Sequence, residues 1–204
     1  KYLDWVVQIP MFFVKRGTNF IAVENFTFAD FLEDGFRHDG QCYQANIADF
    51  ELHLSTLFPE ARLKKFIEVR AADSGPPEMV LALAALCKGL FYHAPSLERA
   101  NDLLDGFRIE DRIDMQRTVV QEGIRAKGST WEMSELASEI VEIATEGLIA
   151  QQKTDANGND ESLYLNVLKR ICDGQETLAD RYIEHFGEGP FDDESARDLL
   201  EMTQ

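Results

Sequence analysis

Apolar and charged residues alternate over residues 66–70, and this period of two predicts a β-strand. Ile67 and Val69 then face one side of the strand, and Glu68 and Arg70 face the other. Two charged side chains on one strand face need water, a partner or a ligand. The pattern therefore allows two interpretations: an exposed ion pair across strands, or a strand that carries an acid and a base into a site.

The beginning of the chain predicts a β-hairpin. Residues 5–14 form a run rich in β-branched and aromatic residues, which predicts a strand with Pro10 at an edge or a bulge. A turn is predicted over residues 15–19, and a short returning strand over residues 20–23.

The segment between this hairpin and the alternating strand is less regular. Thr27 is placed to cap a short helix that runs through Phe31, and residues 33–44 predict a loop. Residues 46–58 fit a helical stripe and an extended strand equally well, and Pro59 ends them.

Beyond residue 76 the chain predicts helices. The helix that begins at Pro77 is apolar nearly all round, so we expect it to be buried, against the back of the sheet. Further helices are predicted from residue 96, over 109–127, from a capping box of Ser129 and Glu132, and over 161–173, 177–186 and 192–202, with a polar loop at 151–160. The predicted fold class is α+β, with a partial antiparallel sheet followed by a helical layer.

Composition narrows the function classes. The chain has 204 residues and a formal net charge of −17, so its surface repels phosphate backbones and anionic membranes, and nucleic-acid binding is not expected. No apolar run reaches the roughly 20 residues of a membrane span. Three cysteines without paired or metal-binding spacing favour a reducing, cytoplasmic compartment, with Cys87 as a buried apolar residue.

Generic catalytic motifs are missing from the sequence. It contains no P-loop, dinucleotide-binding glycine pattern, nucleophile elbow or zinc-binding histidine pair. The four histidines are scattered, which favours structural roles. His53, just upstream of the alternating strand, is the best functional candidate among them.

Longer stretches resemble a known family. Residues 53–64, H-L-S-T-L-F-P-E-A-R-L-K, and residues 68–76, E-V-R-A-A-D-S-G-P, resemble the C-terminal part of plant and proteobacterial glutamate–cysteine ligases, which read approximately H-L-T-T-[LI]-F-P-E-V-R-L-K-x-Y-[LI]-E-x-R-G-A-D-G-G-P. Residues 9–16 are similar to that family's V-P-M-Y-F-x-x-R, and residues 28–32 to its F-x-x-F-L. The resemblance stays in register over about the first hundred residues.

The resemblance implies an ATP-dependent ligase that joins the γ-carboxylate of L-glutamate to the amino group of L-cysteine, the first step of glutathione biosynthesis. The family has a glutamine-synthetase-like antiparallel sheet whose concave face holds Mg²⁺, ATP and substrates. Residues 1–92 would then be the sheet part of the catalytic domain with its buried helix, and residues 93–204 its C-terminal helical region.

The family's E-x-R matches Glu68 and Arg70. The resemblance implies that Glu68 is a Mg²⁺ ligand and that Arg70 contacts phosphate or an acyl phosphate, because this chemistry needs carboxylates for metal ions and cations for the transferring phosphoryl group. Other side chains are expected to line a substrate pocket: Tyr2, Trp5, Met11, Phe13 and His53.

Some positions depart from the family pattern. Residues 77–79 read Pro-Glu-Met where the family has Trp-Arg-Arg, and Leu81 stands where plant members carry a cysteine linked to redox control. Ala71 and Ser74 replace the usual glycines, which indicates a divergent bacterial branch.

The missing part of the enzyme also matters. Most metal and ATP ligands of the family belong to its N-terminal half, which is expected to be a partner of this chain and is absent from it. We therefore expect the chain alone to be inactive.

Two alternative functions remain open. The nearest is a related carboxylate–amine ligase that uses another amine. The other is a non-catalytic interaction domain that acts through the acidic helices beyond Ser129.

Overall fold

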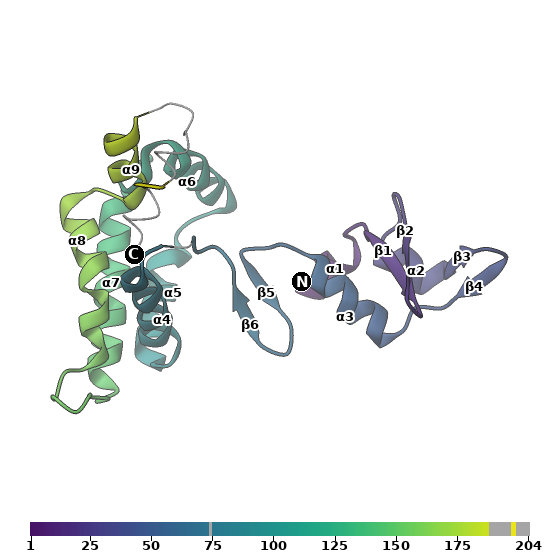
Figure 1. Cartoon of the computed structure of the whole chain (residues 1–204), viewed down its shortest axis with the longest axis horizontal. Coiled ribbons are helices and arrows are strands. Elements are labelled where there is room, and N and C mark those ends of the chain that lie inside the picture. Colours follow the sequence, from purple (N-terminus) through teal and green to yellow (C-terminus); the bar gives the residue numbers. More distant parts are fainter. Residues whose placement is uncertain (74, 188–196, 199–204) are drawn as a thin grey trace. The chain divides into compact units, whose positions relative to one another are not determined.

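The computed structural model of the chain describes residues 1–73, 75–187 and 197–198. The chain divides into two compact units, Lys1–Ala72 and Asp73–Gln204, whose elements are labelled in Figure 1. The first unit combines strands with short helices, and the described part of the second is helical. The α+β class predicted from the sequence is confirmed, with the strands in the first third of the chain.

The first unit contains three antiparallel hairpins. Each hairpin is a separate two-stranded sheet, β1–β2, β3–β4 or β5–β6, so the described strands are antiparallel as predicted but do not join into one sheet. Its elements in order are α1 (Tyr2–Val7), β1 (Phe13–Arg16), β2 (Asn19–Ala22), α2 (Phe28–Asp34), β3 (Phe36–His38), β4 (Gln41–Tyr43), α3 (Ile47–Thr56), β5 (Ala61–Leu63) and β6 (Ile67–Val69).

Two predictions for the first unit are confirmed. The β1–β2 hairpin forms, and Gly17 at its turn has a φ of 58°, a conformation that glycine adopts without steric cost. Thr27 caps α2 through a capping box: its hydroxyl accepts from Asp30 N–H at 3.1 Å, and the Asp30 carboxylate accepts from Thr27 N–H at 2.8 Å.

Two other predictions for this unit are wrong. The strand expected over residues 5–14 is a helix, α1, followed by an extended segment and the shorter strand β1. Tyr2, Trp5, Val6 and Ile9 have helical spacing, and Val6 is the member that the core fully buries. The loop expected over residues 33–44 contains the β3–β4 hairpin.

The ambiguous stretch is helical. The Asn46 side chain accepts hydrogen bonds from Ala48 N–H and Asp49 N–H, at 2.9 and 3.2 Å, and Asp49 accepts from Asn46 N–H at 3.1 Å. This reciprocal cap satisfies N–H groups that a helix leaves unpaired at its start, and it decides for helix α3 over a strand.

Aromatic side chains and one ion pair hold the first unit together. Met11, Val14, Phe28 and Phe31 form its buried cluster. The carboxylate of buried Asp49 accepts two hydrogen bonds from the Arg16 guanidinium, at 2.6 and 3.1 Å. This bidentate pair fixes β1 to the beginning of α3.

The second unit is built around two helices that approach closely, α4 and α7. A Cβ atom added to Gly89 of α4 would lie 2.2 Å from the Ala144 carbonyl oxygen of α7, so these backbones are in contact. The expected full burial of α4 against a sheet is wrong: α7 covers one face, where Ala82, Ala85 and Gly89 are buried, whereas Val80 and Leu81 are 58% and 50% exposed. The elements are α4 (Pro77–Phe91), α5 (Ala94–Asp105), α6 (Ile109–Glu122), η1 (Gly123–Arg125), α7 (Met133–Ala150), η2 (Glu161–Leu165), α8 (Asn166–Gly174) and α9 (Leu178–Phe186).

Several helix boundaries in this unit differ from the predictions: α5 begins at Ala94 instead of residue 96, and residues 161–165 form the 3₁₀ helix η2 ahead of α8. Helix α6 ends at Glu122, before residue 127, because Gly123 takes a φ of 57°. The capping box of Ser129 and Glu132 does not form: Glu132 is itself the N-cap residue, and its carboxylate binds Lys127 at 2.8 Å.

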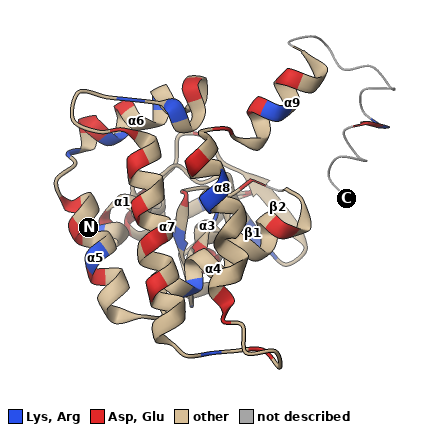
Figure 2. Cartoon of the chain, turned by 90° about the vertical axis from the view of Figure 1, so that its left-hand side faces the viewer, with Lys and Arg blue, Asp and Glu red and all other residues tan. Residues whose placement is uncertain are grey.

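Other features of the second unit agree with the sequence. The helix predicted over residues 177–186 forms as α9, and a capping box of Thr177 and Asp180 begins it. The acidic residues of α7 are exposed, as Figure 2 shows along this helix: Glu135, Glu139, Glu142 and Glu146. The helix predicted over residues 192–202 falls mostly outside the described residues.

The boundary between the compact units follows Ala72, and α4 belongs to the second unit. The division of the catalytic domain at residue 92 stays a prediction. In the described part of the chain, no single helix is long and apolar enough to cross a membrane; α4 and α5 reach that length and composition only as a pair, which is bent by 94°.

Candidate functional site

The candidate site lies on the β5–β6 hairpin, where Arg62 and Glu68 are directly opposite each other. A tight turn joins the two strands, closed by a hydrogen bond from Lys64 N–H to the Phe66 carbonyl at 2.8 Å. Side chains of directly opposite residues lie within reach of each other on one face of a hairpin. The register therefore brings Arg62 to the face that carries Glu68 and Arg70.

Arg62 is a buried cation with several acceptors around it. Its side chain is 7% exposed, and its Nε donates to Glu68 Oε2 at 2.8 Å. Its Nη1 donates to the carbonyls of Ser55 and Leu57, at 2.8 and 2.9 Å. These carbonyls lie at the C-terminal end of α3, where the helix dipole and its unpaired carbonyls favour a cation.

Glu68 connects Arg62 to Arg70. Its Oε2 takes the bonds from Arg62, and its Oε1 accepts from Arg70 Nη1 at 3.0 Å. The hydrogen bond from Arg62, with a contribution from Arg70, lowers the pKa of the Glu68 carboxyl below its ordinary value. Glu68 is therefore an ionised carboxylate with a guanidinium on each oxygen.

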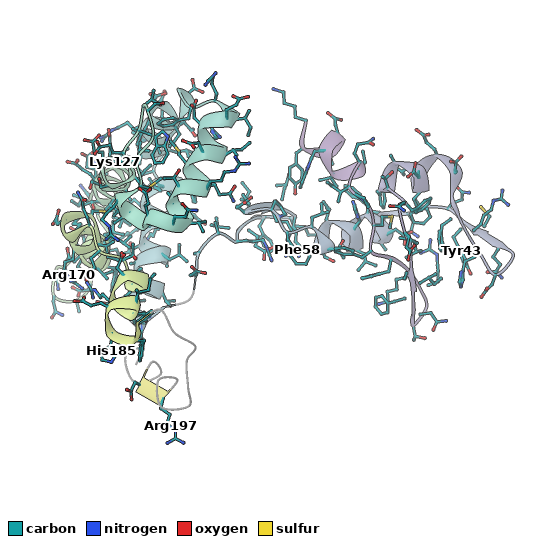
Figure 3. The ribbon with its side chains drawn as sticks, turned by 90° about the horizontal axis from the view of Figure 1, so that it is seen from above. Tyr43, Phe58, Lys127, Arg170, His185 and Arg197 are labelled. Atoms are coloured by element: carbon teal, nitrogen blue, oxygen red, sulfur yellow. The ribbon has the colours of Figure 1, made fainter. Side chains whose placement is uncertain are left out.

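Arg70 is the more accessible of the two arginines. Its side chain is 29% exposed, and its guanidinium lies 5.4 Å from the centre of the Phe58 ring. Phe58, labelled in Figure 3, belongs to the segment between α3 and β5. Among the described residues, its guanidinium donates one hydrogen bond, the one to Glu68. A guanidinium has five N–H donors, so Arg70 keeps donors that suit a phosphate or a carboxylate.

The residues present do not fit a Mg²⁺ site. Mg²⁺ prefers six oxygen ligands at about 2.0–2.1 Å, commonly one or two of them carboxylates. Both oxygens of Glu68 are engaged by arginines. No group of three acidic, histidine or cysteine side chains in the described ranges could hold a metal ion. The prediction that Glu68 binds Mg²⁺ is untested, and these contacts count against it.

Two of the expected pocket residues belong to α1. The Tyr2 hydroxyl accepts a hydrogen bond from Leu63 N–H of β5 at 3.2 Å, so Tyr2 contacts the hairpin that carries the candidate site. The rings of Tyr2 and Trp5 are 5.6 Å apart, and Trp5 is exposed. Tyr2 and Trp5 thus offer an aromatic surface beside β5.

The other three expected pocket residues are engaged in packing. Met11 is buried in the aromatic cluster, and Phe13 meets Phe20 edge-to-face at 5.0 Å on the β1–β2 hairpin. His53 is 2% exposed, donates from Nε2 to the Val6 carbonyl at 2.9 Å and stacks on Phe28. These contacts describe structural roles, and a substrate-binding role for the three stays a prediction.

Each of the two units contains a cavity. One, of about 420 Å³, lies between α3 and the β5–β6 turn in the first unit and is lined by Ile47, Phe50, Glu51, Leu54, Lys64, Lys65 and Phe66. It lies beside the hairpin, and its charged lining consists of the two lysines and Glu51, whose carboxylate lies 4.0 Å from the Lys65 ammonium.

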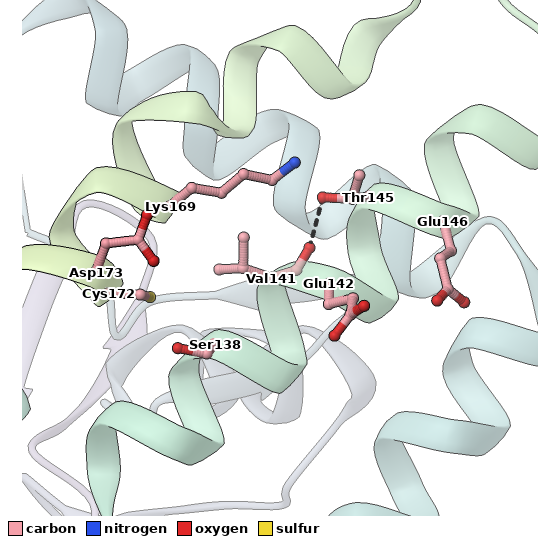
Figure 4. A pocket seen from close by; sticks show the side chains of 8 residues that line it. All are labelled: Ser138, Val141, Glu142, Thr145, Glu146, Lys169, Cys172 and Asp173. Carbon is pink, nitrogen blue, oxygen red and sulfur yellow. Dashed lines mark hydrogen bonds between the residues drawn. The ribbon is translucent and has the colours of Figure 1, made fainter.

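The other cavity, of about 360 Å³, lies between α7 and α8 (Figure 4). The hydroxyls of Ser138 and Thr145 there bond to carbonyls of their own helix, at 2.7 Å each. Burial raises the pKa of the Cys172 thiol, which makes it a poor nucleophile at neutral pH. The two hydroxyls of this cavity are thus engaged within α7, and charged side chains complete its polar lining: Glu142, Glu146, Lys169 and Asp173.

Comparison with known proteins identifies the family. The model of Glutamate-cysteine ligase family 2 (GCS2) matches residues 1–200. This chain belongs to that family. Its match includes the helical unit, whereas the resemblance of the quoted motifs covers only about the first hundred residues.

Curated members of the glutamate–cysteine ligase family agree with this result. The chain is 32% identical over 187 residues to the chloroplastic glutamate–cysteine ligase of Medicago truncatula, covering 90% of this chain and 35% of that protein. It is 29% identical over 184 residues to the enzyme of Nicotiana tabacum, covering 90% and 34%. The chain therefore spans about a third of the length of these relatives.

Sequence reasoning missed Arg62. It lies within the family-like stretch of residues 53–64, but the spacing of Arg62 and Glu68 around a turn was its only other signal. A hairpin centred on residue 65 pairs these two positions, so a prediction of the turn would have found the contact.

Proposed function

We propose that this chain is part of an ATP-dependent glutamate–cysteine ligase that forms γ-glutamylcysteine, the first step of glutathione biosynthesis. The observation that carries the proposal is the family match over residues 1–200. An accessible guanidinium held beside a carboxylate on the E-x-R strand supports it, because this reaction needs a cation at a phosphoryl group.

The proposed reaction has two steps. The γ-carboxylate of glutamate attacks the γ-phosphorus of ATP, which forms an acyl phosphate and releases ADP. The amino nitrogen of cysteine then attacks the acyl carbon, phosphate leaves, and the new amide nitrogen loses a proton.

Arg70 has the chief role that we assign to this chain. Its free N–H donors would bind oxygens of the transferring phosphoryl group or of the acyl phosphate and offset their negative charge. The Phe58 ring lies under one side of the guanidinium, at 5.4 Å, and contributes a cation–π interaction. We also expect Tyr2 and Trp5 of α1, beside this hairpin, to contact the substrate.

Phosphoryl transfer from ATP commonly requires a divalent cation, here Mg²⁺. The described residues do not fit such a site. We therefore propose that the metal ligands belong to the N-terminal part of the enzyme, which has no counterpart in this chain. The matched residues make up 35% and 34% of the two relatives, which are thus more than twice as long as this chain, and this supports the arrangement.

Exposed apolar side chains also support a missing partner. Phe58 and Ile67 are each 71% exposed, and Phe66 is 62% exposed, around the β5–β6 hairpin. Exposed apolar side chains that gather in one place commonly mark an interaction surface. We propose that the N-terminal part of the enzyme covers them.

We propose a cytoplasmic location for this enzyme, on the basis of three cysteines without paired spacing. The relatives named above carry the description chloroplastic, which concerns those proteins.

A comparison of two proteins tests the proposal: the enzyme with its full sequence, and the 204-residue chain alone. With ATP, Mg²⁺ and glutamate, we expect the full sequence to release ADP and form γ-glutamylcysteine when cysteine is added, and the chain alone to form none. Chromatography of the product with a coupled ADP assay measures both. ADP release that does not depend on cysteine would favour a ligase for another amine, and product from the chain alone would refute the proposed need for the N-terminal part.

A further inference from the structure

We propose that Arg62 is a positioning residue for Arg70, and that Glu68 transmits its effect as a bridge between the two guanidiniums instead of binding a metal ion. This inference rests on the proposed function, because it takes Arg70 as the group that meets an anion. It adds a residue, Arg62, to the site.

The first step is the rigidity of Arg62. The guanidinium is buried and has three donors committed, one to Glu68 and one to each of two carbonyls at the end of α3, while its Nη2 also lies 2.7 Å from Glu68 Oε2. A planar guanidinium that donates to several fixed acceptors is held in a single orientation. Arg62 therefore connects the position of the β5–β6 hairpin to the end of α3.

The second step is the bridge. Arg62 uses one oxygen of Glu68, Oε2, and leaves Oε1 to Arg70. A structural ion pair across the hairpin would be complete with Arg62 and Glu68 alone. The third member, Arg70, is held through the second oxygen on the same strand face.

The third step is the effect on Arg70. A solvent-accessible arginine loses much rotamer freedom when it orders on a ligand, and an existing hydrogen bond reduces that loss. The cluster of two arginines and one glutamate has a net charge of +1, in a chain whose formal net charge is −17. The cluster is thus a fixed, positively charged site whose remaining N–H donors can bind an anion.

Arg62→Lys is the decisive variant because lysine keeps the positive charge but lacks the planar guanidinium with its several N–H donors. In the enzyme with its full sequence, we expect kcat/KM for ATP to fall about 100-fold, as misplaced catalytic groups commonly cause. The Mg²⁺ concentration at half-maximal rate should stay unchanged, because the bridge has no metal role. Lys65→Met, which removes an exposed charge from the same hairpin, is the matched control and should keep the wild-type kinetics.

A spectroscopic measurement does not depend on turnover. With nitrogen-labelled arginine, inorganic phosphate should shift the Arg70 Nε–H signal in the wild-type enzyme and in Lys65→Met. The response should be at least tenfold weaker in Arg62→Lys. Thermal unfolding of each variant shows whether its fold is retained.

Each result has a defined meaning. Wild-type kinetics and an unchanged Arg70 signal in Arg62→Lys would overturn the inference, as would a wild-type Arg70 signal that ignores phosphate. If Arg62→Lys does not fold, Glu68→Gln replaces it: a shifted Arg70 signal with the wild-type Mg²⁺ requirement supports the bridge, and an altered Mg²⁺ requirement or an unshifted signal refutes it. If the wild-type enzyme forms no γ-glutamylcysteine but the phosphate response follows these expectations, the proposed function fails and the positioning role stands.

Discussion

The carboxylate of Asp180 stabilises the beginning of α9 in the second unit. Its carboxylate accepts from Arg125 at 2.6 Å and from Thr177 N–H at 2.7 Å, where α9 begins. The hydrogen bonds from Arg125 and Thr177 lower the pKa of Asp180 from 3.8 to about 2. Because the folded-state pKa lies below that of the unfolded chain, its contribution is complete above pH 3.8 and is lost as the pH falls through about 2.

We expect Asp180→Asn to lower the free energy of unfolding by about 1 kcal/mol at pH 7, the usual cost of a lost helix cap with an exposed ion pair. The difference from wild type should shrink as the pH falls from 3.8 toward 2. Urea titrations followed by circular dichroism at pH 7 and at pH 3 measure this. Asp102→Asn on α5, an exposed aspartate, is the control; an equal loss in both variants would contradict the role of the cap.

At the same scale, the sequence was sufficient for some residues of the site. The alternation over residues 66–70 and the family pattern identified Glu68 and Arg70 as neighbours on one face, and the structure joins them at 3.0 Å. Predicting that Arg62 belongs to the site requires the register of the hairpin, and alternation along a single strand does not specify that register. His53 was ambiguous because burial by Phe28 and Val6 is a tertiary property.

The crossing of α4 and α7 is the critical packing feature at the scale of elements. A Cβ on Gly147 would lie 2.2 Å from the Gly89 carbonyl oxygen, and a Cβ on Gly89 would meet the Ala144 backbone. Ser96 of α5 donates to the Ile143 carbonyl at this crossing, at 3.1 Å. Glycine is required here for close approach, and any side chain must move a helix backbone.

We expect Gly89→Ala to destabilise the second unit by about 2 kcal/mol, because the cost of overpacking exceeds the gain in helix propensity. Thermal unfolding of the chain measures the loss. Gly106→Ala is the matched control: nothing lies within 4 Å of its added Cβ, so it should be neutral or slightly stabilising. Equal stability of the two variants would show that the helices tolerate a methyl group between them.

Local signals predict some elements but not all: α3 stays ambiguous in the sequence although its cap residues, Asn46 and Asp49, are three apart. The caps of α2 and α9 each consist of two residues that are three positions apart in the sequence, Thr27 with Asp30 and Thr177 with Asp180. The sequence predicts a strand where α1 forms, because its β-branched and aromatic residues are typical of strands, although Tyr2, Trp5 and Val6 have helical spacing. The end of α6 depends on the backbone conformation at Gly123, which composition alone does not specify.

At the scale of the whole molecule, the chain has two compact units and spans about a third of the length of its curated relatives. The family match over residues 1–200 includes the helical unit, whereas the resemblance of the quoted motifs covers only about the first hundred residues. The α+β class followed from periodicity, but the separation of the strands into three hairpins depends on long-range pairing that periodicity does not reveal.

The central claim is that Arg70 acts on the phosphoryl group in a glutamate–cysteine ligase. The most direct test is kcat for γ-glutamylcysteine formation by Arg70→Lys in the enzyme with its full sequence, with Lys65→Met as the control. We predict that kcat falls by at least about 100-fold in Arg70→Lys, because lysine keeps the charge but loses the fork of donors, and that Lys65→Met keeps the wild-type rate. An Arg70→Lys enzyme with a kcat within about twofold of wild type would contradict the account.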